Sequence, residues 1–286
     1  METELNTPDS TAEAIAALRE WQSDDAPMQL HPGDLGWYQQ LGAERAAAAV
    51  RTWSRDGRIL AVGMLDGPDV LRVTTAPEYL HDPDLARQMA ADIGDPGRGV
   101  LPEGDANIEI PDGAALREPL AAAGWQADEA WTPLFRSLAD PVEAHGLRIE
   151  VVGPEQASLR AELQRAAFEG SRFDEERWHA MASGPAYADA RCLIGFDDKG
   201  DAVALTTVWS AGPGRPGVVE PMGVHEDHRG RGHGKAICLA GAAALRDMGA
   251  SSAIVATPPT LTGAVATYKS AGFLPQPERI DLARKA

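Results

Sequence analysis

Runs of apolar and β-branched residues, interrupted by short polar turns, predict two β-hairpins. In the first, residues 47–53 (AAAVRTW) and 58–65 (RILAVGML) flank a turn that contains Gly57. In the second, residues 191–196 (RCLIGF) and 201–209 (DAVALTTVW) flank a turn that contains Gly200. Two β-favouring runs around a glycine-containing turn are typical of a hairpin.

The same series of elements follows each hairpin. A third strand, a helical stretch, a short strand and a short helix with a small-residue stop are predicted in each half. The strands of these two series are 69–75 and 107–110 in the first half, and 217–224 and 252–257 in the second.

The spacing of the two series is nearly constant. Gly57 and Gly200 lie 143 residues apart, and the glycines that end the short helices, Gly124 and Gly272, lie 148 residues apart. Self-similarity at a fixed period indicates repeated structural units. We therefore expect an α+β fold of two tandem domains, residues 1–140 and 146–286, each a mixed, mostly antiparallel, twisted sheet flanked by helices.

A glycine-rich loop follows the third strand of the second half. Gly230, Gly232 and Gly234 alternate with Arg231 and His233, and a helical pattern then runs to a glycine at 249. Glycine lets the backbone approach a ligand closely. The first amides of a helix have no partner within the helix, and its dipole is positive at that end. The pattern therefore predicts an anion site suited to a pyrophosphate.

Two common phosphate motifs do not fit this loop. A Walker A motif needs a glycine at Arg229 and a Ser or Thr at Ala236, and a dinucleotide-binding GxGxxG needs a glycine at Lys235. A formal GxGxxG at residues 212–217 precedes a strand instead of a helix and contains two prolines, so we interpret it as a loop between strands.

The loop instead resembles a motif of the GNAT acyltransferase superfamily, R/Q-x-x-G-x-G/A, which Arg229, Gly232 and Gly234 match. Residues 220–225 (EPMGVH) resemble the fourth strand of that family, and residues 264–273 (AVATYKSAGF) resemble its A-x-x-x-Y-x-x-x-G-F helix. The resemblance covers the chain from Leu147 onward, and the N-terminal half only in outline.

The resemblance implies that acetyl-CoA is the co-substrate, without a metal, and that its pyrophosphate binds the amides of residues 230–235. The residues expected to bind it are Met222, Val224, Arg229, Gly230, Arg231, Gly232, His233, Gly234 and Lys235. The first half should not bind CoA, because its equivalent stretch, residues 73–86, has no glycine and carries three acidic residues.

Two residues are candidates for the chemistry of amide formation. Glu220, four residues before Val224, stands where many relatives carry a general base, and Tyr268 stands where the family has its general acid. A solvent-facing glutamate and a core tyrosine are the alternatives. Pro221 and Gly223 are poor residues for a regular strand, so we expect a bulge that frees an amide, with Val224 as candidate, for the thioester oxygen.

The resemblance also indicates where the acceptor binds. The stretch 168–179 mixes aromatic and acidic residues, and Phe173 and Trp178 are candidates to line the acceptor pocket. Ordinary packing of an amphipathic helix explains these aromatic residues equally well.

The expected function is transfer of an acyl group, acetyl in the first place, from CoA to a primary amine of a small molecule. Mycothiol synthase also pairs a weakened N-terminal unit with an active C-terminal one, which makes amino-sugar thiol precursors one candidate class of acceptor and aminoglycoside-like amines another. The alternative is a non-catalytic acyl-CoA sensor, although both Glu220 and Tyr268 are retained.

Composition and charge argue against several other classes of function and site. The net charge of −17 argues against nucleic-acid binding. Cys192 and Cys238 lie in apolar stretches outside any metal-ligand spacing, as expected of buried free thiols in a reducing cytoplasm. His225 and His228 lack further ligands, so we expect no metal there. No apolar run is long enough for a membrane span, and a homodimer stays open.

Overall fold

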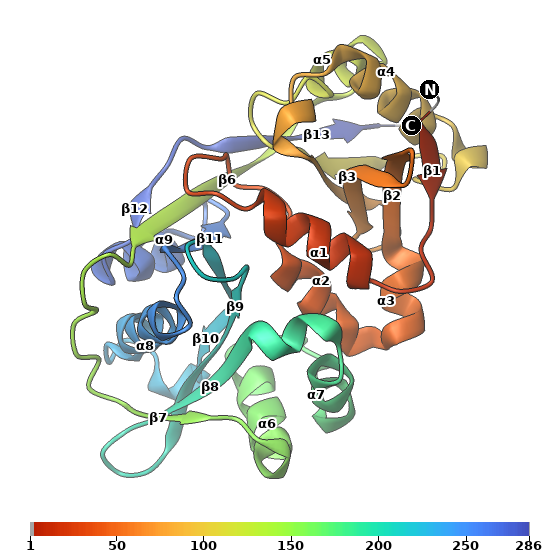
Figure 1. Ribbon diagram of the computed structural model, residues 1–286. Helices are drawn as coiled ribbons and strands as arrows, with labels where there is room; N and C mark the ends of the chain where they lie inside the picture. Colours follow the sequence, from red (N-terminus) through yellow and green to blue (C-terminus); the bar gives the residue numbers. More distant parts are fainter. Residues whose placement is uncertain (1–2, 286) are drawn as a thin grey trace. The chain divides into compact units, whose positions relative to one another are not determined.

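The structure, a computed structural model, describes residues 3–285, which group into two compact units (Figure 1). The first unit holds the chain up to His31, Ala43–Trp131 and the chain from Pro277 onward. The second holds Pro32–Gly42 and Thr132–Gln276. Neither unit is one continuous segment, whereas the sequence predicted a division between residues 140 and 146. Each has a mixed sheet and flanking helices, which confirms the α+β class.

The first unit follows the predicted series and adds strands at both ends. Its strands are β1 Glu4–Asn6, β2 Val50–Arg55, β3 Arg58–Leu65, β4 Val70–Thr75, β5 Ala106–Glu109, the first half of β6 Gln126–Ser137, and β13 Arg279–Arg284. Its α-helices are α1 Ala12–Trp21, α3 Ala43–Ala49, α4 Pro83–Gly94 and α5 Arg117–Ala122, with 3-10 turns η2 Pro77–Tyr79 and η3 Pro96–Arg98.

The sheet of the first unit has the order β1-β2-β3-β4-β5-β13-β6. The predicted hairpin is β2–β3. Strands β4 and β5 are parallel, with Arg72 opposite Glu109 as their last pair. Strand β13, from the end of the chain, lies antiparallel between β5 and β6. A core that includes Trp53, Leu71, Met89 and Ile108 is buried between this sheet and its helices.

The second unit contains the other predicted series. Its strands are the second half of β6, β7 Arg148–Val151, β8 Ala190–Phe196, β9 Ala202–Ser210, β10 Gly217–Val224, β11 Ser252–Thr257 and β12 Leu274–Pro275. Its α-helices are α2 Pro32–Tyr38, α6 Ala157–Ala167, α7 Glu175–Ala182, α8 His233–Asp247 and α9 Thr262–Ser270. Its 3-10 turns are η1 Gln39–Leu41, η4 Pro154–Gln156, η5 Pro185–Asp189 and η6 Glu226–His228.

The sheet of the second unit has the order β6-β11-β10-β9-β8-β7, and β12 also pairs with β6. The hairpin β8–β9 is the second predicted one. Strands β10 and β11 are parallel and pair only where Gly217 and Val218 face Ala253 and Ile254. Beyond that point β10 pairs with β9 alone and β11 with β6, so a wedge opens between the two parallel strands.

Helix α2 packs on β9 through glycines. A Cβ added to Gly33 would lie 2.5 Å from the Cβ of Trp209, and one added to Gly36 would lie 2.4 Å from the indole ring. The absence of side chains at these two positions therefore lets an N-terminal helix lie directly on the Trp209 ring. This segment belongs to the second unit although it precedes most of the first in sequence.

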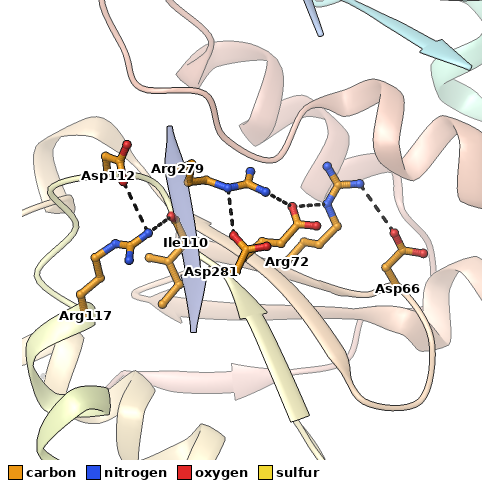
Figure 2. Close-up of polar contacts among 8 residues, drawn as sticks. Asp66, Arg72, Ile110, Asp112, Arg117, Arg279 and Asp281 are labelled. Atoms are coloured by element: carbon orange, nitrogen blue, oxygen red, sulfur yellow. Dashed lines mark hydrogen bonds and ion pairs between the residues drawn. The ribbon is translucent and has the colours of Figure 1, made fainter. Parts of the chain in front are cut away.

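A network of ion pairs joins β4, β5 and β13 in the first unit (Figure 2). Glu109 accepts from Arg72 and from Arg279, each at 3.0 Å, and Arg279 also contacts Asp281 at 3.0 Å. Burial, together with the charge of Glu109, raises the pKa of Asp281 to about 6 despite the neighbouring guanidinium groups. The network holds β13, the last strand of the chain, to β4 and β5.

We predict a measurable pH dependence from Asp281. The pKa of this carboxyl is higher in the folded protein, about 6, than the roughly 3.9 of an unfolded chain. The folded state therefore binds the proton more tightly in that window, and the stability contributed by Asp281 falls as the pH rises through it. Relative to the wild type, Asp281→Asn should gain up to about 3 kcal/mol in unfolding free energy between roughly pH 4 and pH 7. Urea unfolding of the full chain measures this, and an equal difference at both pH values would contradict it.

Candidate functional site

The first turn of α8 lies open at the end of the glycine-rich loop. Gly232 is its N-cap residue, has φ 86° in the left-handed region, and provides no side chain to cap the helix. A Cβ added at Gly230 or Gly232 would meet no atom within 4 Å. The first turn of α8 therefore has no side-chain cap at Gly232, and the binding of an anion by its amides stays a prediction.

Gly234 has a different reason for being glycine. A Cβ there would lie 2.9 Å from the Cγ2 of Thr267 and 3.6 Å from a methyl group of Val224. The first turn of α8 thus packs directly against α9 and the end of β10. This contact brings the helix N-terminus, the tip of β10 and the helix that carries Tyr268 together.

The basic residues of the loop hold its shape. Arg229 donates from Nη2 to the carbonyl of Ala167 at the end of α6 (2.9 Å), and Arg231 donates to the carbonyl of Asp227 (2.9 Å). Both side chains are exposed, as is Lys235. Partial burial lowers the pKa of His233, with a smaller effect from the charge of His228. His233 is thus kept neutral at the positive end of α8.

The bulge predicted in the fourth strand of the family is present. The register between β9 and β10 shifts between Val219 and Met222. Met222, beyond the bulge, packs beside α8 against both apolar clusters of the second unit. Val224 lies at the end of β10, half-buried. Its role as an amide donor stays a prediction.

Two buried side chains, neither of them indicated by a local sequence pattern, hold the bulge in place. Trp209 donates from Nε1 to the carbonyl of Glu220 (2.8 Å), and Thr206 donates from Oγ1 to the carbonyl of Pro221 (3.0 Å). Both donors project from β9, on opposite faces of the sheet. They satisfy the two carbonyls that the shifted register leaves without ladder partners.

Glu220 and Tyr268 lie close enough to influence each other's charge. Tyr268 is 6% exposed on α9, and burial raises the pKa of its phenol far above the usual range, with smaller contributions from Cys238 and Glu220. The phenol therefore stays protonated at any physiological pH. Glu220 is half-buried on the bulge. The roles of Glu220 as base and Tyr268 as acid stay predictions.

The aromatic residues expected at the acceptor site are buried and in contact with further aromatic rings. Phe173 stacks on Trp37 of α2 with ring centroids 5.3 Å apart. Trp178 meets the ring of Tyr187 edge-on, and Tyr187 meets Trp209 in the same way. These contacts connect the expected acceptor residues to the ring that holds the carbonyl of Glu220. Direct contact with an acceptor stays a prediction.

A buried arginine of α6 was also not predicted from the sequence. Arg160 is 0% exposed, donates to the Sγ of Cys192 (3.1 Å) and to Gln164 (2.8 Å), and lies over the ring of Phe173. Cys192 and Cys238 are both buried free thiols, as predicted. The guanidinium packs on the ring of Phe173 and so helps to hold this side chain in place.

Between residues 3 and 285, no group of three His, Cys, Asp or Glu side chains is arranged to hold a metal ion. His225 instead accepts from the amide of Asp227 (3.2 Å) within the loop. In the same part of the chain, no helix combines the length and apolar character of a membrane span.

The equivalent helix of the first unit is closed. At the start of α4 the carboxylate of Asp82 accepts from the amides of Asp84 (2.8 Å) and Leu85 (3.0 Å). A side chain of the protein thus takes the place that an anion would occupy, and the first helical residue is Pro83, which has no N–H. This agrees with the expectation that the first half does not bind CoA.

We predict that Gly232→Leu weakens acetyl-CoA binding, because a side chain there blocks the approach to the amides of α8. Gly200→Leu is the matched control: Gly200 has φ 88° and equally open surroundings, but lies in the β8–β9 turn. Both variants carry the same backbone strain. Calorimetry should show reduced affinity for Gly232→Leu alone. Equal affinities in the two folded variants would contradict the phosphate assignment.

Three comparisons with known proteins agree with this geometry. Residues 158–273 match the model of the Acetyltransferase (GNAT) family. The mycothiol acetyltransferase of Thermobispora bispora is 29% identical over 266 residues, which cover 91% of this chain and 76% of that protein.

Solved structures show the same fold along the whole chain. A tandem GNAT protein from the clavulanic acid biosynthesis pathway has a TM-score of 0.64 at 16% identity, over 99% of this chain and 98% of that one. A GCN5-related N-acetyltransferase from Sphaerobacter thermophilus has a TM-score of 0.58 at 18% identity, over 99% and 95%. The tandem arrangement therefore extends beyond the residues that match the family model.

Proposed function

We propose that the second unit, of which residues 158–273 match the model of the Acetyltransferase (GNAT) family, transfers the acetyl group of acetyl-CoA to a primary amine of a small molecule. The observation that carries this proposal is the uncapped first turn of α8, reached through Gly230 and Gly232. It lies beside a bulged strand with Glu220 and a helix with Tyr268.

The wedge between β10 and β11 supports this use of the helix N-terminus. The amides of residues 230–235 bind the pyrophosphate, and the pantetheine arm enters between the diverging strands, where Met222 and Val224 lie. Acetyl-CoA supplies an activated thioester carbonyl. The side chains of the second unit hold and orient the substrates and transfer the protons.

Glu220 acts as the general base. A typical alkyl ammonium has a pKa near 10, so removing its proton at pH 7 costs about 4 kcal/mol. The Glu220 carboxylate accepts this proton, directly or through water, as the amine nitrogen attacks the acetyl carbonyl. Trp209 holds the carbonyl of Glu220 and thereby restricts where this carboxylate can point.

Tyr268 acts as the general acid. When the C–N bond forms and the C–S bond breaks, the leaving sulfur carries negative charge. The buried phenol, kept protonated by its raised pKa, donates its proton to that sulfur. Its proximity to Glu220 allows the two proton transfers to occur within one site.

A small-molecule acceptor is supported by the similarity to a mycothiol acetyltransferase. The similarity to a mycothiol acetyltransferase spans most of both chains. Amino-sugar thiol precursors and aminoglycoside-like amines are the two classes we propose to test. Phe173 and Trp178 contribute to the aromatic side of the acceptor site.

An acyl-CoA sensor without turnover is the alternative function, since an open helix N-terminus serves binding equally well. A library of primary amines, incubated with acetyl-CoA and the full chain, separates the two. Release of free CoA thiol with any amine, above hydrolysis without amine, supports the transferase. Tight binding of acetyl-CoA with no release across the library supports the sensor.

Glu220→Gln should lower kcat/KM by about 10²–10⁴-fold at neutral pH, because the variant cannot accept the amine proton. The deficit should shrink as the pH rises toward the pKa of the acceptor amine, where the free amine predominates. Glu162→Gln, an exposed glutamate on α6, is the control. A pH-independent deficit would indicate that Glu220 is structural.

Tyr268→Phe should lower kcat by about 10²-fold while the affinity for acetyl-CoA stays nearly constant, because the phenol acts on the leaving sulfur. The wild-type rate should show no loss from Tyr268 ionisation below roughly pH 10, since burial raises its pKa. Tyr79→Phe in the first unit serves as control. An unchanged kcat in Tyr268→Phe would assign this tyrosine to the core only.

A further inference from the structure

Three histidine rings form a row beside the glycine-rich loop, and the proposed acetyl transfer assigns no role to His225 and His228. The rings of these two residues meet edge-on with centroids 5.3 Å apart, and the centroids of His228 and His233 are 6.2 Å apart. All three side chains are half-buried. The row therefore runs from the end of β10, through η6, to the first residue of α8.

Arg231 of the loop contacts this row. Its Nη1 lies 3.5 Å from Nδ1 of His228, and its Nη2 donates to the carbonyl of Asp227 at 2.9 Å. A guanidinium group donates hydrogen bonds and accepts none, so the contact with His228 needs a lone pair on Nδ1. In this arrangement the two side chains carry a single positive charge between them, that of Arg231.

His233 is also held in its neutral form. Partial burial is the largest cause that lowers the pKa of its imidazole, His228 and Arg231 lower it further, and the carboxylate of Asp197 opposes them. The dipole of α8, positive at this end, acts in the same direction as burial. Negative charge brought to the first turn of α8 would reverse this balance and favour the protonated ring.

The other charged groups around the row come from three elements. Asp197 and Lys199 belong to the β8–β9 turn, Glu226 and Asp227 to η6, and Lys235 to α8. All except Asp197 are exposed, so solvent and salt screen their charges. Asp197 is fixed by two amides of its own turn, at 2.9 and 3.0 Å. An anion at the row therefore meets one fixed carboxylate and three side chains that are, or can become, positive.

The proposed position of the coenzyme brings an anion to this place. Its diphosphate is assigned to the amides of residues 230–235, and the rings of His228 and His233 come from the two ends of that loop. The diphosphate stays ionised throughout the neutral range, where imidazoles titrate. An opposite charge within about 4–6 Å favours the charged form of a titratable group. The two imidazoles should therefore hold protons more tightly beside the diphosphate.

We propose that His228 and His233 bind the diphosphate of acetyl-CoA together with Arg231, and that the two imidazoles take up a proton from solution when the coenzyme binds. This inference rests on the proposed coenzyme site, but not on acetyl transfer. Arg231 then donates to a phosphate oxygen in place of Nδ1 of His228, which leaves that nitrogen free to accept the proton. The contribution of the pair to coenzyme affinity is present at acidic pH and is lost as the pH rises and the bound pair gives up its proton.

Calorimetry of the full chain with dephospho-CoA counts the protons. This probe keeps the diphosphate and lacks the 3′-phosphate, whose own ionisation near neutral pH would add to the count. Titrations at neutral pH in PIPES and in Bis-Tris, which differ in ionisation enthalpy, give the number of protons taken up. We expect an uptake that approaches about one proton per chain. No uptake, or a release, would overturn the proposal.

Glutamine variants assign the protons to the two imidazoles. His228→Gln and His233→Gln each replace a titratable ring with a neutral amide and should take up fewer protons. The affinity of the wild type should fall about tenfold between about pH 6 and about pH 8, and that of each variant should change less. His179→Gln, on an exposed position of α7, is the matched control and should behave as the wild type.

The outcomes separate this inference from the proposed function. Binding of dephospho-CoA with an uptake that both variants retain would overturn the role of the imidazoles and leave the transferase proposal standing. Binding of acetyl-CoA but not of dephospho-CoA would assign the affinity to the 3′-phosphate and also overturn it. Proton-linked binding, lost in the variants, by a protein that acetylates no amine of the library supports the inference and contradicts acetyl transfer.

Discussion

The unsatisfied amides at the start of a helix are the constraint from which the rest of the structure follows. Every α-helix begins with N–H groups that have no partner within the helix. In the first unit, Asp82 supplies a carboxylate to two amides of α4. In the second unit, Gly232 supplies no side chain, so the equivalent amides of α8 remain available. The same helix position is thus capped by the protein in the first unit and left uncapped in the second, where we propose that it binds an anion.

The parallel strand pairs β4–β5 and β10–β11 also differ between the two units. In the second unit β10 and β11 separate after two residue pairs, with the apolar Val219 and Val255 buried near the divergence. In the first unit the last pair is Arg72 and Glu109, which form an ion pair, and Glu109 also pairs with Arg279 (Figure 2). In the first unit, ion pairs hold the parallel strands together, which fits a role in stabilising the fold. In the second unit, the apolar gap between β10 and β11 fits the proposed entry of the pantetheine arm of CoA.

Local patterns allowed much of this arrangement to be predicted. The runs 217–224 and 252–257 are β10 and β11 as the structure has them, because both contain β-branched residues, Gly217 begins the first and Pro258 follows the second. The bulge followed from Pro221 and Gly223, which disturb a ladder wherever they occur. The open loop at 230–234 could be predicted from its glycines alone, because the lack of a side chain is a property of the residue itself.

Features that depend on partners distant in sequence could not be predicted. Strand β13, residues 279–284, was not among the predicted elements, and nothing local indicates that it pairs with β5 and β6 of the first unit. Helix α2 belongs with the second unit because Gly33 and Gly36 fit the ring of Trp209, about 175 residues away, a match between shapes. The roles of Trp209 and Thr206 likewise depend on carbonyls that only the folded bulge leaves free.

Hydrogen exchange with and without acetyl-CoA tests the central claim most directly, because it reports the amides themselves. The account predicts that saturating acetyl-CoA slows exchange in the peptide that covers residues 230–240, at the start of α8, and leaves residues 82–90 of the first unit unchanged. Protection at 82–90, or none at 230–240 under saturating acetyl-CoA, would contradict it.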